Sequence, residues 1–191
     1  MRTDRKSSSK DRKPCHKCGK KSRFSVIDEY HYTESGLENV YLQNVQTLSC
    51  ECGESVVLTA LPSLLRIIAM CFAYKPASLN GREIRFIRHV LRRKALDFAQ
   101  ALSITPEYLS RVENEAAIPG LSLDKLIRTR LLLGLFQAYP EMTEMFDVKE
   151  FEAVLDRDLP VNDGTLGLYV EYVGPHVKDH EQIEFEFKQA A

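Results

Sequence analysis

Apolar and polar residues follow two different periods along this chain, and the change of period divides it. Residues 23–32 (RFSVIDEYHY) and 38–48 (ENVYLQNVQTL) are rich in Tyr, Val and Leu, and they predict short strands joined by a turn at Gly36. Residues 62–73 (PSLLRIIAMCFA) predict an amphipathic helix, with a proline in its first turn. A run of further helices is predicted from Asn80 to about Ala138.

The first helix of that run has clear start signals. Asn80 and Glu83 have the spacing of an N-cap and its N3 partner, and Leu79 with Ile84 predicts a hydrophobic staple. The residues expected to face the core are Ile84, Ile87 and Leu91 in this helix and Leu96, Ala99 and Leu102 in the next one.

A short turn at Ser103-Ile104 separates the second helix from a third. Thr105 is expected to cap that third helix, Pro106 to occupy its first position, and Leu109 with Val112 to anchor it inward. Ser103 stands where a glycine would better tolerate a left-handed backbone.

The C-terminal part carries weaker signals. Asp147 and Glu150 have capping-box spacing and predict a short helix. In IEFEF, Ile183, Phe185 and Phe187 alternate with two glutamates, which is typical of a strand with one buried face.

These elements predict an α+β fold, with a small N-terminal zinc ribbon, an all-α helix-turn-helix domain and an acidic α/β extension. The expected divisions are a disordered basic tail (1–13), a zinc-binding module (14–60), a linker helix (61–78), a helix-turn-helix DNA-binding domain (79–138) and an acidic C-terminal extension with a short helix and a β-hairpin (139–191).

The net charge of −1 conceals a strong asymmetry. Residues 1–23 carry ten Lys/Arg and two acids, whereas residues 139–191 carry four Lys/Arg and thirteen acids. No apolar segment is long enough to span a bilayer, and none follows the basic N-terminus as a signal peptide would. We therefore expect a cytoplasmic protein without a membrane partner.

The cysteines predict a structural metal site. Cys15-x2-Cys18 and Cys50-x-Cys52 flank a 31-residue insert, and a glycine follows each pair. Four thiolates suit tetrahedral zinc and leave no open position for a reacting water, so we expect structural Zn²⁺. Because the second pair is unusually tight, His16 and His31 are alternative ligands. Cys71 lies in an apolar helix and is expected in the core.

Two short helices joined by a tight turn predict a third helix whose polar side can enter a major groove of DNA. Arg can donate two bonds to guanine and Glu can accept from cytosine, so Arg111 and Glu107 are the principal expected base readers. The full set of expected base contacts is Glu107, Tyr108, Ser110 and Arg111, and the expected phosphate contacts are Lys94, Thr105 and Asn114.

The motifs CHKCGK, EYHYTESGLENVYLQNV, SCECGE, LNGREIRFIR and LSRVENE resemble those of the MqsA/YgiT-type proteins, which combine a zinc finger with an Xre-type helix-turn-helix. The resemblance covers roughly residues 15–130. It implies zinc on Cys15, Cys18, Cys50 and Cys52, and a structural ion pair between Arg88 and Glu113. Many such proteins are antitoxins that repress their own operon.

We therefore expect a sequence-specific transcriptional repressor rather than an enzyme. One short recognition helix reads only a few base pairs, so a homodimer on a palindromic operator is expected. In the antitoxin version, the zinc module or the acidic extension binds a basic ribonuclease toxin. The alternative hypothesis is a protein- or RNA-interaction adaptor that stacks bases on Tyr30, His31, Tyr32 and Tyr41.

Overall fold

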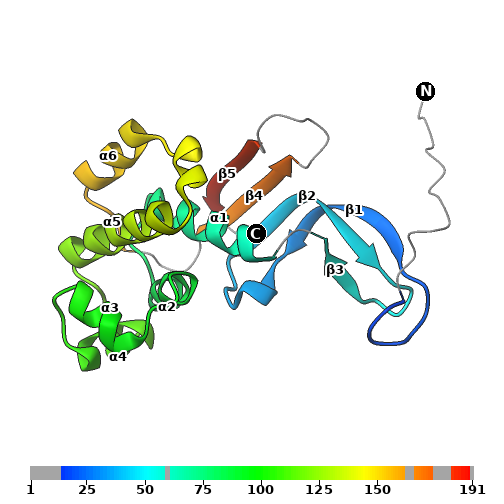
Figure 1. Cartoon of the computed structure of the whole chain (residues 1–191), viewed down its shortest axis with the longest axis horizontal. Helices are drawn as coiled ribbons and strands as arrows, with labels where there is room; N and C mark the ends of the chain where they lie inside the picture. The colour runs from blue at the N-terminus through cyan, green and yellow to red at the C-terminus, as the bar shows by residue number, and fades with distance from the viewer. Residues whose placement is uncertain (1–13, 59–60, 162–165, 174–181, 190–191) are drawn as a thin grey trace.

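The computed structural model describes residues 14–58, 61–161, 166–173 and 182–189, and it has a mixed α+β fold. A sheet occupies one end and the middle of the molecule, and most helices gather at the other end (Figure 1). The strands are β1 (Arg23–His31), β2 (Val40–Ser49), β3 (Ser55–Val57), β4 (Leu166–Val173) and β5 (Gln182–Gln189). The α-helices are α1 (Leu61–Ala73), α2 (Gly81–Val90), α3 (Ala95–Ala101), α4 (Pro106–Glu113), α5 (Leu121–Ala138) and α6 (Val148–Asp156), and single 3-10 turns lie at Thr33–Ser35 and Pro140–Met145.

The sheet joins the two ends of the sequence. Its strand order is β1-β2-β4-β5, with β3 also paired to β2. β1 and β2 are antiparallel around the predicted turn at Gly36, whose φ is 79°. β4 pairs in parallel with β2, and Val40 lies opposite Leu168. The acidic hairpin β4–β5 therefore extends the sheet of the N-terminal module, and the two regions share one hydrophobic layer.

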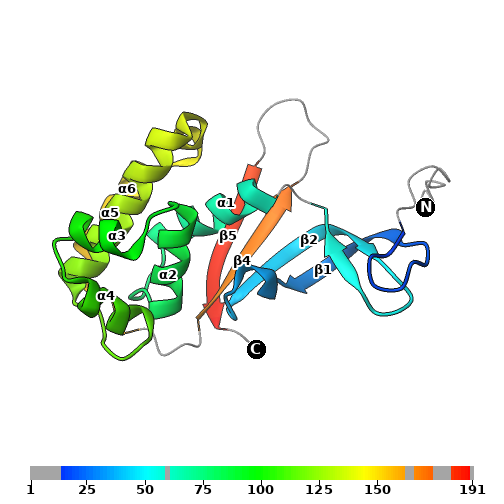
Figure 2. The same cartoon turned by 60° about the horizontal axis from the view of Figure 1, so that its bottom comes forward.

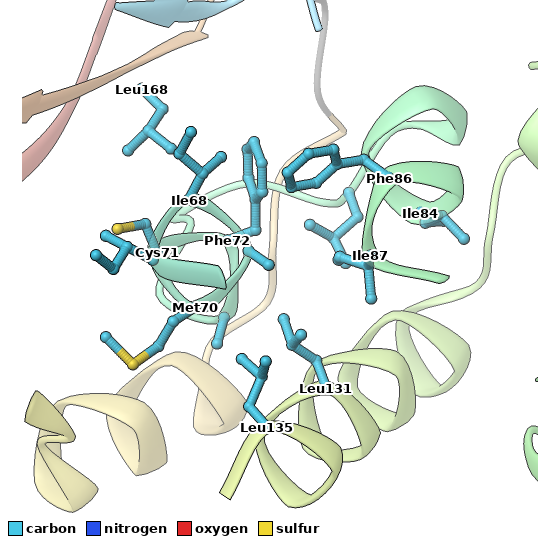
Figure 3. Close-up of a cluster of buried hydrophobic side chains, with 14 of the residues drawn as sticks. Ile68, Met70, Cys71, Phe72, Ile84, Phe86, Ile87, Leu131, Leu135 and Leu168 are labelled. Carbon is cyan, nitrogen blue, oxygen red and sulfur yellow. The ribbon is translucent and has the colours of Figure 1, made fainter. Parts of the chain in front are cut away.

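Helix α1 lies at the centre of the core. Ile68, Cys71 and Phe72 are fully buried, so the helix is covered on more than one side and Cys71 is a core residue, as predicted. In Figure 3, Leu168 of β4 lies on one side of α1, and Leu131 and Leu135 of α5 lie on the other. The segment expected to be a linker is thus the layer that holds sheet and helices together.

Strand β5 adds its apolar side to the same core. The rings of Phe187 and Phe72 have centroids 6.3 Å apart, and those of Phe185 and Tyr74 are 5.7 Å apart. Glu184 and Glu186 are exposed, which confirms the predicted alternation for the part of the strand whose side chains are described.

The local helix signals are confirmed. Asn80 and Glu83 form a reciprocal capping box, and Thr105 and Asp147 cap α4 and α6 through their side chains. Ser103 has a φ of 56°, in the left-handed region that its position in the turn requires. The expectation for Leu96 is wrong: its side chain is 54% exposed. Phe98 is buried in its place, while Ala99 and, just after α3, Leu102 are buried as predicted.

A buried ionic cluster links the sheet to the helices. Lys75 Nζ lies 2.6 Å and 2.7 Å from the two carboxylate oxygens of Glu83, and both side chains are fully buried. Glu83 also accepts a hydrogen bond from Asn39, the residue that precedes β2. Burial lowers the pKa of Lys75, because desolvation outweighs the attraction of Glu83.

A second buried pair fastens the end of α1 to α5. Arg128 donates to Asp124 at 2.6 Å and to the backbone carbonyls of Phe72, Ala73, Lys75 and Ala77. The guanidinium therefore binds carbonyls at the C-terminus of α1 and in the segment that follows it. No helix in the described part of the chain is long and apolar enough to cross a membrane.

Candidate metal centre and candidate nucleic-acid interface

The four predicted cysteines converge at the end of the sheet that lies farthest from the helices. The sulfur atoms of Cys15 and Cys52 are 3.8 Å apart, those of Cys18 and Cys50 are 3.4 Å apart, and all four lie within 4.8 Å of one another. Tetrahedral zinc with bonds of about 2.3 Å to sulfur needs sulfurs roughly 3.8 Å apart. The cluster is therefore close enough to hold a metal ion and is compatible with zinc.

Two tight loops present these thiols in the same way. Gly19 donates its backbone N–H to the Cys15 carbonyl, and Gly53 donates to the Cys50 carbonyl. The two glycines have φ values of 73° and 88°, a left-handed conformation that other residues rarely adopt. The Cys-x-Cys pair thus forms a loop equivalent to that of the Cys-x2-Cys pair, and both of its thiols reach the cluster.

The surroundings of the thiols favour ionisation at one position and oppose it at another. Backbone N–H groups of Cys18 and Lys17 lower the pKa of Cys15 to about 6. The Cys52 N–H also favours the Cys50 thiolate, but burial and hydrogen bonds with the other three thiols raise the pKa of Cys50 to about 12. A bound zinc ion would require thiolate ligands, so metal binding would release protons from the cluster.

The alternative histidine ligands make other contacts. His16 Nε2 lies 3.3 Å from Glu54, and Lys17 lies 3.2 Å from the other oxygen of that carboxylate. His31 Nε2 makes a 2.7 Å hydrogen bond with the backbone carbonyl of Glu38. The donor set is therefore the four cysteines.

Helix α4 is the second candidate site. Its inward residues Leu109, Val112 and Glu113 are buried, as the sequence predicted for the first two. The side chains of Glu107, Ser110 and Arg111 are exposed. Tyr108 is half-buried and packs against the hydrophobic core, so less of its ring is presented to solvent.

The orientation of α4 is held by a bidentate ion pair. Arg88 of α2 places its Nε 2.6 Å and its Nη2 2.7 Å from the two carboxylate oxygens of Glu113. These are the two residues for which the family resemblance implies an ion pair. Gly81 permits the close approach of α2, because a Cβ atom there would lie 2.2 Å from the Val112 carbonyl oxygen.

The three expected phosphate contacts lie in different surroundings. Lys94 is exposed at the N-cap of α3, and Thr105 accepts the Tyr108 N–H as the cap of α4. Asn114 is exposed but already hydrogen-bonded, because its side chain accepts from Arg85 and donates to the Ser110 carbonyl. A phosphate at Asn114 would compete with these bonds.

The aromatic residues of the alternative RNA-binding hypothesis make internal contacts. Tyr32 is 1% exposed, and the Tyr41 ring stacks between those of His31 and Tyr169, with centroids 4.8 Å and 4.6 Å away. The phenol of Tyr30 donates to Glu34. Base stacking by these rings would require several of those contacts to break.

Comparison with protein-family models, with curated proteins and with solved structures finds no match to this chain. The assignment of a function therefore depends on the geometry of the two candidate sites.

Proposed function

We propose that this chain is a sequence-specific DNA-binding regulator of transcription, in which α3 and α4 form a helix-turn-helix and a structural zinc ion holds the N-terminal module together. The observation that supports this function best is the two-sided character of α4. One side is buried and fixed to α2 by the Arg88–Glu113 pair, while Glu107, Ser110 and Arg111 are exposed on the other. A rigid helix with an open polar side is what base reading in a major groove requires.

The neighbouring charges support the same proposal. Arg92, Arg93, Lys94 and Arg111 are exposed and form no ion pair with any other described residue. The first three precede α3 and Arg111 lies in α4, so cationic side chains flank this pair of helices. They would follow the phosphate backbone, which supplies most of the affinity for DNA.

Zinc in this proposal stabilises the fold and takes no part in a reaction. Four thiolates close a tetrahedral coordination sphere, so no position remains for a substrate. The centre lies at the far end of β1 and β2 from α4 (Figure 2). The free energy of zinc binding would stabilise the folded state of a module whose own hydrophobic core is small.

Selection of duplexes from a random library by the purified protein tests the DNA-binding function. We expect an enriched inverted repeat, because one recognition helix reads only a few base pairs and a homodimer doubles the site. On that sequence, Arg111→Ala should weaken binding by about 1–3 kcal/mol and relax the preference at one position. Lys94→Ala should weaken all duplexes alike and reduce the salt dependence.

Arg157→Ala is the matched control, because it removes an exposed arginine at the end of α6, which Figure 1 places across α5 from α4. Its affinity for DNA should equal that of the unchanged protein. Base reading by α4 would be contradicted if the selection enriched no sequence. It would also be contradicted if Arg111→Ala lost the same affinity for selected and for random DNA.

Metal analysis tests the zinc assignment. The purified protein should contain one zinc per chain, and Cys50→Ser should lose it. Cys71→Ala removes a thiol that is fully buried in the core and outside the cluster, so that variant should retain zinc. Full zinc occupancy in Cys50→Ser would remove this residue from the site.

A further inference from the structure

The arginines that the structure describes divide into two groups by their partners. Five of them lie against carboxylates: Arg23, Arg82, Arg85, Arg88 and Arg128. Arg92, Arg93, Arg111, Arg130 and Arg157, by contrast, form no ion pair with any residue that the structure describes. Arg66 lies 4.0 Å above the ring of Tyr139 and donates to Ser63, again without a carboxylate.

Four of these arginines meet at one groove: Arg66, Arg92, Arg93 and Arg130. Two neighbouring hollows of about 480 Å³ and 230 Å³ share Val90, Arg92 and Tyr139 along their boundary. Arg93 and Arg130 line the larger hollow, and Arg66 lines the smaller one together with His89. No aspartate or glutamate is among the described residues that line either hollow, although the chain contains 27 acidic residues.

The floor of the larger hollow is apolar. Leu133 of α5 is 57% exposed and Leu91 is partly exposed, while Phe98 of α3 and Leu135 of α5 lie almost fully buried beneath them. Gly134 lets α2 and α5 come together beneath it, because a Cβ atom at this position would lie 2.8 Å from the side chain of Leu91. The groove therefore combines an apolar floor with a cationic rim.

This combination selects for one kind of ligand. Arginines that face one another without counter-ions repel, and an anion between them would relieve that repulsion. A bare phosphate would satisfy the rim and leave the apolar floor in contact with water. A neutral apolar molecule would cover the floor and leave the guanidinium groups unpaired. A volume of about 480 Å³ lies in the usual range for small-molecule sites.

From this arrangement we infer that the groove between α2, α3 and α5 binds a small amphipathic anion, with an apolar body on Leu91 and Leu133 and an acidic head between Arg92 and Arg130. The site is separate from the outward residues of α4 and from the cysteine cluster, although it shares Arg92 and Arg93 with the cationic surface proposed above to follow DNA. The inference does not depend on the function proposed above.

Fluorescence titration with 8-anilinonaphthalene-1-sulfonate, an aromatic sulfonate, tests this inference on the full chain. We expect saturable binding of one probe per chain. Arg92→Gln and Arg130→Gln should each weaken it about 3–10-fold, the effect of losing one charge-assisted contact in a half-open groove. Ala101→Phe should weaken it about tenfold, because Ala101 lines the larger hollow and a ring there would fill it.

Two variants serve as matched controls. Arg82→Gln removes an arginine paired with Glu38, and Ala116→Phe adds a ring at an exposed alanine outside both hollows. Both should bind the probe within about twofold of the unchanged protein. Equal thermal midpoints and zinc contents across the set would show that every variant is folded.

Competition with simple compounds decides which chemistry the groove recognises. Dodecanoate should displace the probe, while dodecanol and inorganic phosphate should do so at least about tenfold less well. Equal displacement by dodecanol would reduce the groove to a nonspecific apolar surface, and equal displacement by phosphate would reduce it to a site for bare anions such as DNA phosphates. Either result would overturn the inference. So would loss of probe binding at the protein concentrations where sedimentation shows the chain to be a dimer, because a second copy would then occupy the groove.

Discussion

The buried pair Lys75–Glu83 allows the most direct test of how the sheet and the helices are held together. Neither side chain has solvent contact, and the ammonium lies within 2.7 Å of both carboxylate oxygens. Lys75→Met would leave the Glu83 carboxylate with only the Asn80 N–H and the Asn39 amide as donors. An uncompensated buried charge of this kind costs about 3–5 kcal/mol.

That cost is large relative to the total, because domains are stable by only about 5–15 kcal/mol. At a slope of about 2 kcal/mol per molar urea, Lys75→Met should lower the unfolding midpoint by about 2 M. Circular dichroism of the zinc-loaded protein measures this shift. Glu83→Gln should be about as harmful, because it leaves the ammonium unpaired.

The double variant Lys75→Met/Glu83→Gln separates the charges from the packing. Its neutral amide can still accept from Asn80, so its loss of unfolding free energy should be smaller than the sum of the single losses by about 2–3 kcal/mol. Arg23→Met, which breaks an ion pair whose partners are 76% and 70% exposed, should leave the midpoint unchanged. A loss below about 1 kcal/mol for Lys75→Met, or strictly additive losses, would refute this reasoning.

Four further predictions concern stability. The Tyr32 hydroxyl is buried without a hydrogen-bond partner among the described residues, so Tyr32→Phe should raise the free energy of unfolding in urea by about 1 kcal/mol. Tyr74→Phe should lower it by a similar amount, because the Asp147 N–H donates to that hydroxyl at 3.0 Å. Burial raises the pKa of Tyr32 and of Tyr74 to about 12, above the usual 10.0, so the unfolded chain loses these protons first. The contribution of these two protons to the free energy of unfolding should therefore be fully present below pH 10 and be lost as the pH rises towards 12. The loss should be less steep in Tyr32→Phe, and an equal slope in that variant would exclude Tyr32 as a cause. Gly81→Ala should destabilise the protein by about 1–3 kcal/mol in thermal unfolding, because its methyl group would strike the Val112 carbonyl; an unchanged midpoint would show that α2 and α4 can separate at no cost.

The sequence was sufficient for features that neighbouring residues determine. A cap and its N3 partner lie three residues apart, so Asn80–Glu83 and Asp147–Glu150 are readable without a structure. The turn at Ser103 was also readable from the sequence. So was the cysteine cluster, because four thiols in two tight loops are typical of a metal site. The burial of Leu96 was misjudged because a helix of seven residues gives little periodicity to read.

The tertiary structure decided what distant segments do together. Val40 and Leu168 pair in parallel although 128 positions separate them, and no local pattern specifies such a partner. Helix α1 reads as amphipathic because Arg66 interrupts it, yet the Tyr139 ring covers that arginine and the helix lies at the centre of the core. The unpaired arginines of the groove likewise come from α1, from the end of α2 and from α5. Capping depends on contacts within one turn of the chain, whereas burial and charge pairing depend on which surfaces meet after folding.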